Sequence, residues 1–188
     1  MSARAQATAA TRRRLLAAAW EHFGTQPYEE VRLSEIAAAA AVTVQTLHAS
    51  FGTKEQLLTA AYIWWGEQVI AGRDLAPVGR VAGAIANLFE HYETHGSAVL
   101  RMLSQEERFP AVKQMTDVGR FYHREWAARI FQPLLSGLRG RARERRLAAI
   151  VVATDLLVWK LLRLDMALDR EEAERIMVDT VQAVASAA

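Results

Sequence analysis

The N-terminal stretch 11–58 constrains the fold more than any other part of this 188-residue chain. Apolar side chains recur there at spacings of three and four, in short runs that are separated by helix breakers. This pattern predicts a first helix over residues 11–23, a second over 33–40 and a third over 44–50. Only the turn 41–43 separates the last two, which is the arrangement of a helix-turn-helix.

The rest of the chain is also predicted to be helical. Ala and Leu dominate, Gly and Pro are sparse, and alternating β-branched runs are missing, so the fold class is all-α. Hydrophobic residues make up 52% and charged residues 23%, as expected for a globular protein. We expect a flexible arm over 1–10, helices over 78–94, 97–105, 109–135 and 141–168, a loop over 137–140, and a last helix ending near residue 185.

Composition excludes several classes of chemistry. No cysteine is present, so disulfide bonds and thiolate chemistry are absent. The net charge is +2, and residues 1–60 carry six basic and five acidic side chains, so DNA binding would depend on local placement of charge. No convincing export signal is found, and the most apolar segment, 147–159, is shorter than the ~18 residues of a membrane-spanning helix. We therefore expect a cytoplasmic protein with no membrane partner.

Polar residues mark the helix starts. The hydroxyl of Thr43 can accept a hydrogen bond from a free amide group at the start of the third helix. Thr53 and Gln56 have the spacing of a capping box, which predicts the start of a fourth, long helix. Asp169 and Glu172 have the same spacing before the last helix.

Several short motifs occur together in the N-terminal quarter: Arg14-Leu15-Leu16, Ala18-Ala19, Phe23, Tyr28, Ile36-Ala37, Ala41-Val42-Thr43, Thr46-Leu47-His48, Phe51 and Thr53-Lys54-Glu55-Gln56-Leu57-Leu58. Without gaps, they resemble the N-terminal DNA-binding domain of the TetR family of bacterial transcriptional regulators. The resemblance implies a three-helix helix-turn-helix DNA-binding domain over residues 1–54. It implies a larger C-terminal helical domain for ligand binding and dimerisation over residues 55–188, which matches the family only in length and helical pattern.

The chain departs from the family pattern inside this domain. The family's turn usually carries glycine where this chain has Ala41, and an alanine at a positive φ angle costs roughly 1 kcal/mol. The second helix usually follows Ser or Thr, whereas this chain has Arg32, so we expect that cap to be missing. Two positions that usually carry aromatic or histidine groups are His48 and Ser50 here.

The third helix carries side chains suited to the DNA major groove. Gln45 can pair with adenine through two hydrogen bonds, and the methyl group of Thr46 can contact a thymine methyl group. Lys54 precedes a helix whose free amide groups also attract phosphate. The predicted DNA contacts are Arg14, Thr43, Val44, Gln45, Thr46, His48, Ser50 and Lys54. The alternative is a small helical subdomain whose polar positions are merely solvated.

Large flexible side chains gather in the middle of the chain, and the family resemblance implies that they line a ligand pocket. They are Trp64, Trp65, Phe89, Tyr92, Met102, Met115, Phe121, Tyr122 and Trp126. The implied effector is an apolar or aromatic small molecule, which His91, Glu93 or His123 could orient, and the alternative is an ordinary hydrophobic core. His91 and His95 have the spacing of a metal pair, but no third ligand is evident, so no metal is expected.

The segment 141–168 is apolar on nearly all faces, which predicts burial on all faces and therefore a partner. Two helix pairs from two chains would form a four-helix interface, as the family resemblance also implies. The predicted dimer-interface residues are Leu147, Val151, Leu157, Trp159, Leu161 and Ile176. A helix buried inside a monomer is the alternative, and the arginine cluster 139–146 is expected to be a solvated loop.

Together these features predict a homodimeric, ligand-responsive transcriptional regulator. We expect a repressor that binds a near-palindromic operator in double-stranded DNA and is released by the small-molecule effector. A helical small-molecule-binding protein with a weakened DNA-binding head is the alternative. An enzyme is not expected, because the sequence holds no nucleophile elbow, phosphate loop, metal set or paired carboxylates, and no cofactor is implied.

Overall fold

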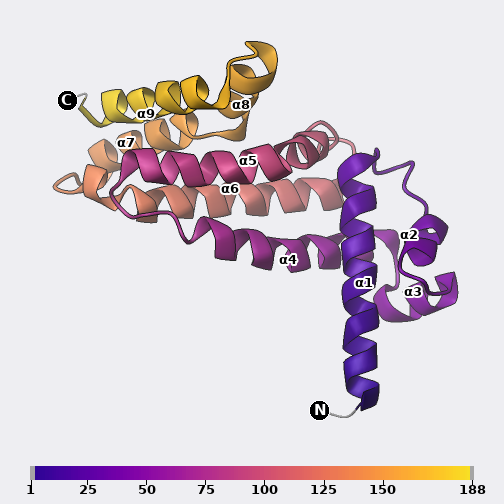
Figure 1. Ribbon diagram of the computed structural model, residues 1–188. Helices are drawn as coiled ribbons and strands as arrows, with labels where there is room; N and C mark the ends of the chain where they lie inside the picture. Colours follow the sequence, from indigo (N-terminus) through magenta and orange to yellow (C-terminus); the bar gives the residue numbers. More distant parts are fainter. Residues whose placement is uncertain (1–2, 187–188) are drawn as a thin grey trace. The chain divides into compact units, whose positions relative to one another are not determined.

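The computed structural model describes residues 3–186, and these form helices without any strand (Figure 1). The elements are α1 (Ala3–Thr25), α2 (Leu33–Ala39), α3 (Val44–Phe51), α4 (Lys54–Arg73), α5 (Val81–Leu103), α6 (Pro110–Ile130), the 3₁₀ helix η1 (Gln132–Leu135), α7 (Gly140–Ala153), α8 (Leu156–Lys160), the π-helical turn η2 (Leu161–Asp165) and α9 (Arg170–Ser186). The predicted all-α class is confirmed. None of the described helices is long and apolar enough to cross a membrane.

The chain packs as two compact units. Unit 1 comprises Met1–Val69 and Ala98–Thr116, and unit 2 comprises Ile70–Ser97 and Asp117–Ala188. The predicted division at residue 54 concerns function rather than packing, and it stays a prediction.

The core of unit 1 holds the three N-terminal helices together. Leu15, Ala19 and Phe23 follow one another at helical spacing on α1, and each is at most 1% exposed. Ile36 of α2 and Leu47 of α3 are fully buried in the same cluster. These side chains orient α3 through its buried face, so its other face is left to solvent.

The first helix begins earlier than the sequence analysis predicted. Residues 1–10 were expected to form a flexible arm, but α1 already begins at Ala3. The prediction is wrong for residues 3–10, because this alanine-rich segment has high helix propensity and no breaker precedes Gly24. Residues 1 and 2 lie outside the described part of the chain.

The two helices predicted on either side of Gly96, over 78–94 and 97–105, form one helix in the structure. Helix α5 continues through this glycine, so the predicted stop at Gly96 is wrong. A Cβ atom at Gly96 would lie 2.7 Å from the Trp159 ring of α8, so glycine here permits a close approach between two helices. The next predicted helix, 109–135, also ends early, since α6 stops at Ile130 and η1 follows.

The single helix predicted over residues 141–168 is three elements in the structure. Helix α7 ends at Ala153, Thr154 leaves the helical conformation with a φ of −107°, and Asp155 begins α8 as its N-cap. The Asp155 carboxylate accepts a hydrogen bond from the Leu157 amide group at 2.8 Å, which competes with continuation of the helix. Within one chain Val152 is 66% and Leu157 is 56% exposed, so burial of this segment on all faces requires a partner and stays a prediction.

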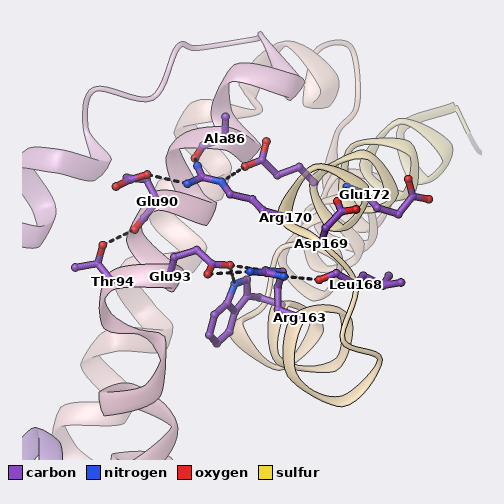
Figure 2. A network of polar contacts seen from close by, with 11 residues as sticks. Ala86, Glu90, Glu93, Thr94, Arg163, Leu168, Asp169, Arg170 and Glu172 are labelled. Atoms are coloured by element: carbon purple, nitrogen blue, oxygen red, sulfur yellow. Dashed lines mark hydrogen bonds and ion pairs between the residues drawn. The ribbon is translucent and has the colours of Figure 1, made fainter.

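Ion pairs within unit 2 connect η2 and the start of α9 to helix α5. Arg163 of η2 donates from Nε to Oε1 of Glu93 on α5 at 2.7 Å, and it also donates to the Leu168 carbonyl group. Arg170 of α9 lies 3.0 Å from the Glu90 carboxylate on the same face of α5 (Figure 2). The result is that α5 holds both η2 and the start of α9, while α7 packs against α9 (Figure 1).

Candidate DNA-binding surface

The turn between α2 and α3 has the backbone geometry expected of a helix-turn-helix with a left-handed residue. Ala41 has a φ of +54°, the region that glycine adopts without steric cost. The Val42 amide group donates to the Ala37 carbonyl group at 2.9 Å, and the Ala41 amide group donates to that of Ala38 at 3.0 Å. These bonds satisfy the last carbonyl groups of α2 and turn the chain sharply toward α3.

The helix caps follow the sequence predictions. Thr43 caps α3, since its hydroxyl accepts a hydrogen bond from the Thr46 amide group at 3.1 Å. Arg32 precedes α2 and makes no side-chain cap, as expected. At the start of α4 the capping box is complete. The backbone amide of Thr53 donates to the side-chain Oε1 of Gln56 at 2.9 Å, and the backbone amide of Gln56 donates to the side-chain Oγ1 of Thr53 at 3.2 Å.

Helix α3 has one buried and one exposed face. Leu47 is fully buried and Phe51 is 8% exposed, so these two side chains anchor the helix in unit 1. The predicted DNA contacts on α3 are all exposed: Val44, Gln45, Thr46, His48 and Ser50. The structure therefore brings these five positions together on one solvent-facing surface, which we name the α3 surface.

Local hydrogen bonds fix several side chains of the α3 surface. The hydroxyl groups of Thr43 and Thr46 lie 2.9 Å apart, and the Ser50 hydroxyl donates to the Thr46 carbonyl group at 2.8 Å. His48 Nδ1 donates to the Gly52 carbonyl group at 2.8 Å, because a carbonyl oxygen can only accept. Its Nε2 atom is then the ring position left for another partner.

Gln45 differs from its neighbours on this surface. Its side chain is exposed and, among the residues that the structure describes, it makes no hydrogen bond within the protein. Both the donor and the acceptor of its amide group are therefore free for a base edge.

The two predicted basic contacts are held by intramolecular bonds. Arg14 donates from Nε to the Ala40 carbonyl group at 3.1 Å, so it also satisfies the C-terminal end of α2. Lys54 Nζ lies 4.6 Å from the centre of the Tyr28 ring and 3.4 Å from the Glu29 carbonyl oxygen. Partial burial lowers the pKa of Lys54.

Arg12 belongs beside this surface, although the sequence analysis left it out of the contact set. Its guanidinium group lies over the Phe51 ring, 4.4 Å from the ring centre, and the residue is exposed. The contact joins α1 to the end of α3 across 39 residues of sequence, so no local spacing could have predicted it.

Residues 15–61 match the family model described as bacterial regulatory proteins, tetR family. The match spans α2, the left-handed turn and the whole of α3, together with the C-terminal part of α1 and the start of α4. This match identifies residues 15–61 as a region similar to the DNA-binding part of TetR-family regulators.

Solved structures share this fold over nearly the whole chain. A transcriptional regulator from Rhodococcus sp. Rha1 is 16% identical, with a TM-score of 0.70, covering 92% of this chain and 95% of its own. A transcriptional regulator from Pseudomonas aeruginosa PAO1 is 16% identical with a TM-score of 0.70, and the match covers 93% of this chain and 90% of that regulator. A protein named as a TetR-family transcriptional regulator from Rhodococcus sp. is 14% identical with a TM-score of 0.70, and the match covers 95% of this chain and 100% of that protein. At these identities the similarity shows the fold alone. No curated protein matches the sequence.

The match supports a DNA-binding regulator of transcription rather than an enzyme. The similarity in fold extends over both packing units. Within residues 3–186, no group of three or more His, Asp or Glu side chains is arranged to hold a metal ion.

The residues predicted to line a ligand pocket fall into both packing units. Trp64, Trp65, Met102 and Met115 belong to unit 1, while Phe89, Tyr92, Phe121, Tyr122 and Trp126 belong to unit 2. In unit 1, Trp65 stacks on Trp20 with ring centres 4.2 Å apart, as in an ordinary core. In unit 2, Phe121 is 66% exposed and faces solvent, whereas Phe89 and Trp126 are buried.

The residues predicted at a dimer interface also differ in exposure. Leu147 and Trp159 are at most 3% exposed, and Val151 and Ile176 are half-buried in unit 2. Exposed apolar side chains do gather near them on α7, α8, η2 and the residue that follows. They are Val152, Leu157, Leu161, Leu164 and Met166, each at least 49% exposed, and we name them the apolar row.

Proposed function

We propose that this protein is a homodimeric repressor of the TetR family that binds a near-palindromic operator and is released by a small-molecule effector. The observation that carries the proposal is the α3 surface. It is exposed and polar, Thr43 caps its start, and Leu47 and Phe51 anchor it from behind. A helix presented in this way fits the major groove with its first turn against the base edges.

The proposed contact roles follow from the hydrogen-bond donors and acceptors that each side chain does not use within the protein. Gln45 and Thr46 face the bases, with Val44 beside them. Thr43, His48 and Ser50 face phosphates together with the basic side chains Arg12, Arg14 and Lys54. The functional DNA-binding domain is residues 1–54, and residues 55–188 serve ligand binding and dimerisation.

The apolar row supports dimerisation with a second copy of this chain. Leu157 of α8 and Leu161, the C-cap residue of that helix, are spaced by four residues, which places them on one helical face. Each is about half exposed or more, and apolar surface of this kind is stabilised by burial against a partner. A two-fold axis through this face pairs two DNA-binding heads, and each head then reads one half of the operator.

An effector in the helical part can act on DNA only through different affinities for two conformations. We propose that the effector-bound dimer holds its α3 surfaces at a spacing that does not match successive major grooves. The nine predicted pocket residues remain candidates for its lining. This action places the protein in the cytoplasm.

A gel-shift experiment tests the DNA-binding role. The purified full chain is titrated against the DNA upstream of its own gene and against unrelated DNA of the same length, at low and at physiological salt. We expect retardation of the upstream DNA that survives an excess of the unrelated DNA. A folded dimer that retards neither DNA at low salt would overturn the proposal.

The second candidate is a helical small-molecule-binding protein with a weakened DNA-binding head. It is favoured by two local costs in the head, the left-handed Ala41 and the uncapped start of α2 after Arg32. Ligand-induced shifts of the melting temperature without any gel shift would support this candidate over the first.

A further inference from the structure

Arg73, the last residue of α4, carries a buried positive charge in unit 2. Only 5% of the residue is exposed, and its Nε atom is buried without any hydrogen-bond partner. Among residues 3–186, no carboxylate forms an ion pair with it. Because a buried charge is costly unless it is paired, this guanidinium group is in a state that a bound anion would stabilise.

The side chains in direct contact with the Arg73 guanidinium group are aromatic and neutral. Its guanidinium group lies 4.3 Å from the ring centre of Trp126 and 5.2 Å from that of Tyr122. Its Nη2 atom donates to His123 Nδ1 at 3.1 Å. The adjacent carboxylate, that of Asp74, is engaged by Arg129 and by the Tyr122 hydroxyl.

The hydrogen bonds beyond His123 have a fixed direction. A guanidinium group can only donate, so His123 Nδ1 accepts and its Nε2 carries the proton. His123 Nε2 donates a hydrogen bond to Thr154 Oγ1 at 3.1 Å, and the Thr154 hydroxyl in turn donates to the Ile150 carbonyl group at 2.8 Å. Burial, and then the nearby Arg73 charge, lower the pKa of His123 to about 3, so the ring is neutral and adds no second positive charge beside Arg73.

We propose that unit 2 binds a small organic acid whose carboxylate pairs with Arg73 and whose apolar part packs against Tyr122 and Trp126. A guanidinium group presents two parallel N–H donors that match a carboxylate, and the unpartnered Nε is one of them. The inference rests on the proposed effector-responsive function. It narrows the effector class from apolar or aromatic molecules to aromatic carboxylates.

The same network leads to the break between α7 and α8. Thr154 stands at this break, and its carbonyl group accepts a hydrogen bond from the buried Tyr92 hydroxyl at 2.9 Å. A carboxylate on Arg73 competes with His123 for the guanidinium donors and so releases the ring that holds the Thr154 hydroxyl. The apolar row has members on both sides of Thr154, at Val152 and Leu157. Anion binding would therefore change the conformation of the surface proposed for dimerisation.

Matched pairs of ligands test the site on the full chain. Benzoate, phenylacetate and indole-3-acetate are compared with their uncharged amides by calorimetric titration at pH 7.5. We expect at least one acid to bind wild-type protein tenfold or more tighter than its amide. Absence of binding by all three acids, or equal affinity for acid and amide, would overturn the inference.

Two variants locate the binding. Arg73→Met should abolish the preference for acid over amide. The control is Arg124→Met, which removes a surface arginine of α6 that pairs with Glu144, and this variant should retain the preference. If Arg73→Met does not fold, Arg73→Lys keeps the charge but lacks the two parallel donors, and it should reduce the preference. A folded Arg73 variant that retains the full preference contradicts the proposed site.

The outcome for DNA is read separately. If an acid binds through Arg73 but does not release the upstream DNA in a gel shift, the carboxylate site stands and the proposed release mechanism fails. If an amide or another uncharged aromatic releases the DNA while no acid binds, the regulatory function stands and the carboxylate site fails.

Discussion

At the residue scale, Ala41 carries a backbone cost that a single substitution can remove. Its φ of +54° lies in the left-handed region, where a Cβ atom is unfavourable and glycine is not. We expect Ala41→Gly to raise the free energy of unfolding by about 0.5–1 kcal/mol, measured by urea unfolding. The matched control is Ala38→Gly inside α2, which should lower stability by a similar amount. Destabilisation by both changes would contradict the left-handed turn.

Gln45 is the residue on which base recognition should depend most. Its amide group has no partner in the protein and lies at the first turn of α3. Gln45→Ala should weaken operator binding by about 1–3 kcal/mol and relax the base preference at one position of each half-site, with no change in melting temperature. Gel shifts with single-base operator variants measure this. The exposed Gln68→Ala on α4 is the control and should bind as wild type does.

The sequence predicted residues whose roles are local. Thr43, Thr53 and Gln56 satisfy amide groups within three residues, so spacing alone identified them. Arg12 and Arg73 could not be identified in this way. Their importance comes from the Phe51 ring and from the missing counter-ion, and both arise only when distant segments pack.

At the element scale, α5 and α8 approach closely because position 96 has no side chain. A Cβ atom there would lie 2.7 Å and 2.9 Å from two ring atoms of Trp159. We expect Gly96→Ala to lower the free energy of unfolding by about 1–3 kcal/mol through overpacking, although alanine favours a helix. Gly66→Ala in α4 meets no atom within 4 Å and should instead stabilise by about 0.5–1 kcal/mol. Equal effects of the two changes would show that the α5–α8 contact is looser than described.

Glycine and aspartate explain why some helix boundaries were predicted wrongly. Gly96 was taken as a stop, yet a glycine can equally permit helices to touch, and only the position of Trp159 distinguishes the two. The break at Thr154–Asp155 was missed because the flanking residues are strongly apolar, although Asp155 is a good N-cap residue.

At the scale of the whole molecule, the apolar row should determine the oligomeric state. Leu157→Glu combined with Leu161→Glu places two like charges on the proposed two-fold interface, so the protein should become monomeric. Light scattering coupled to size exclusion measures the mass. Operator affinity should fall at least tenfold, because two linked heads bind more tightly than one.

A matched control uses exposed apolar residues outside the row. Leu75 is 79% and Val78 is 56% exposed, and changing both to Glu should leave mass and DNA affinity unaltered. A wild-type protein that is already monomeric, or a row variant that stays dimeric, contradicts the proposed interface.

Stability should fall as the solution becomes acidic. Burial, aided by Arg73, lowers the pKa of His91 and His123 to about 3 from about 6.5. Below pH 6.5 the unfolded chain therefore binds protons that the folded chain does not, so unfolding is favoured. We expect the free energy of unfolding to drop between pH 6.5 and 5 by up to about 1.4 kcal/mol per pH unit for each histidine.

Urea unfolding at pH 7.5 and pH 5.5 measures this dependence. His123→Gln should reduce the slope, because it removes a group whose pKa is lowered by burial. Stability that is constant over this range would show that neither histidine is held neutral by the fold.

The amino-acid sequence was enough to predict the all-α class, the helix-turn-helix over α2 and α3, its caps and the resemblance of residues 15–61 to TetR-family regulators. These depend on helical periodicity and on hydrogen bonds within a few residues, which spacing records directly. Only the tertiary structure decided how the apolar segment 141–168 is divided, which of its side chains remain exposed, and that Arg73 is buried without a counter-ion. Burial and charge pairing depend on residues far apart in the chain, so composition and local pattern do not determine them.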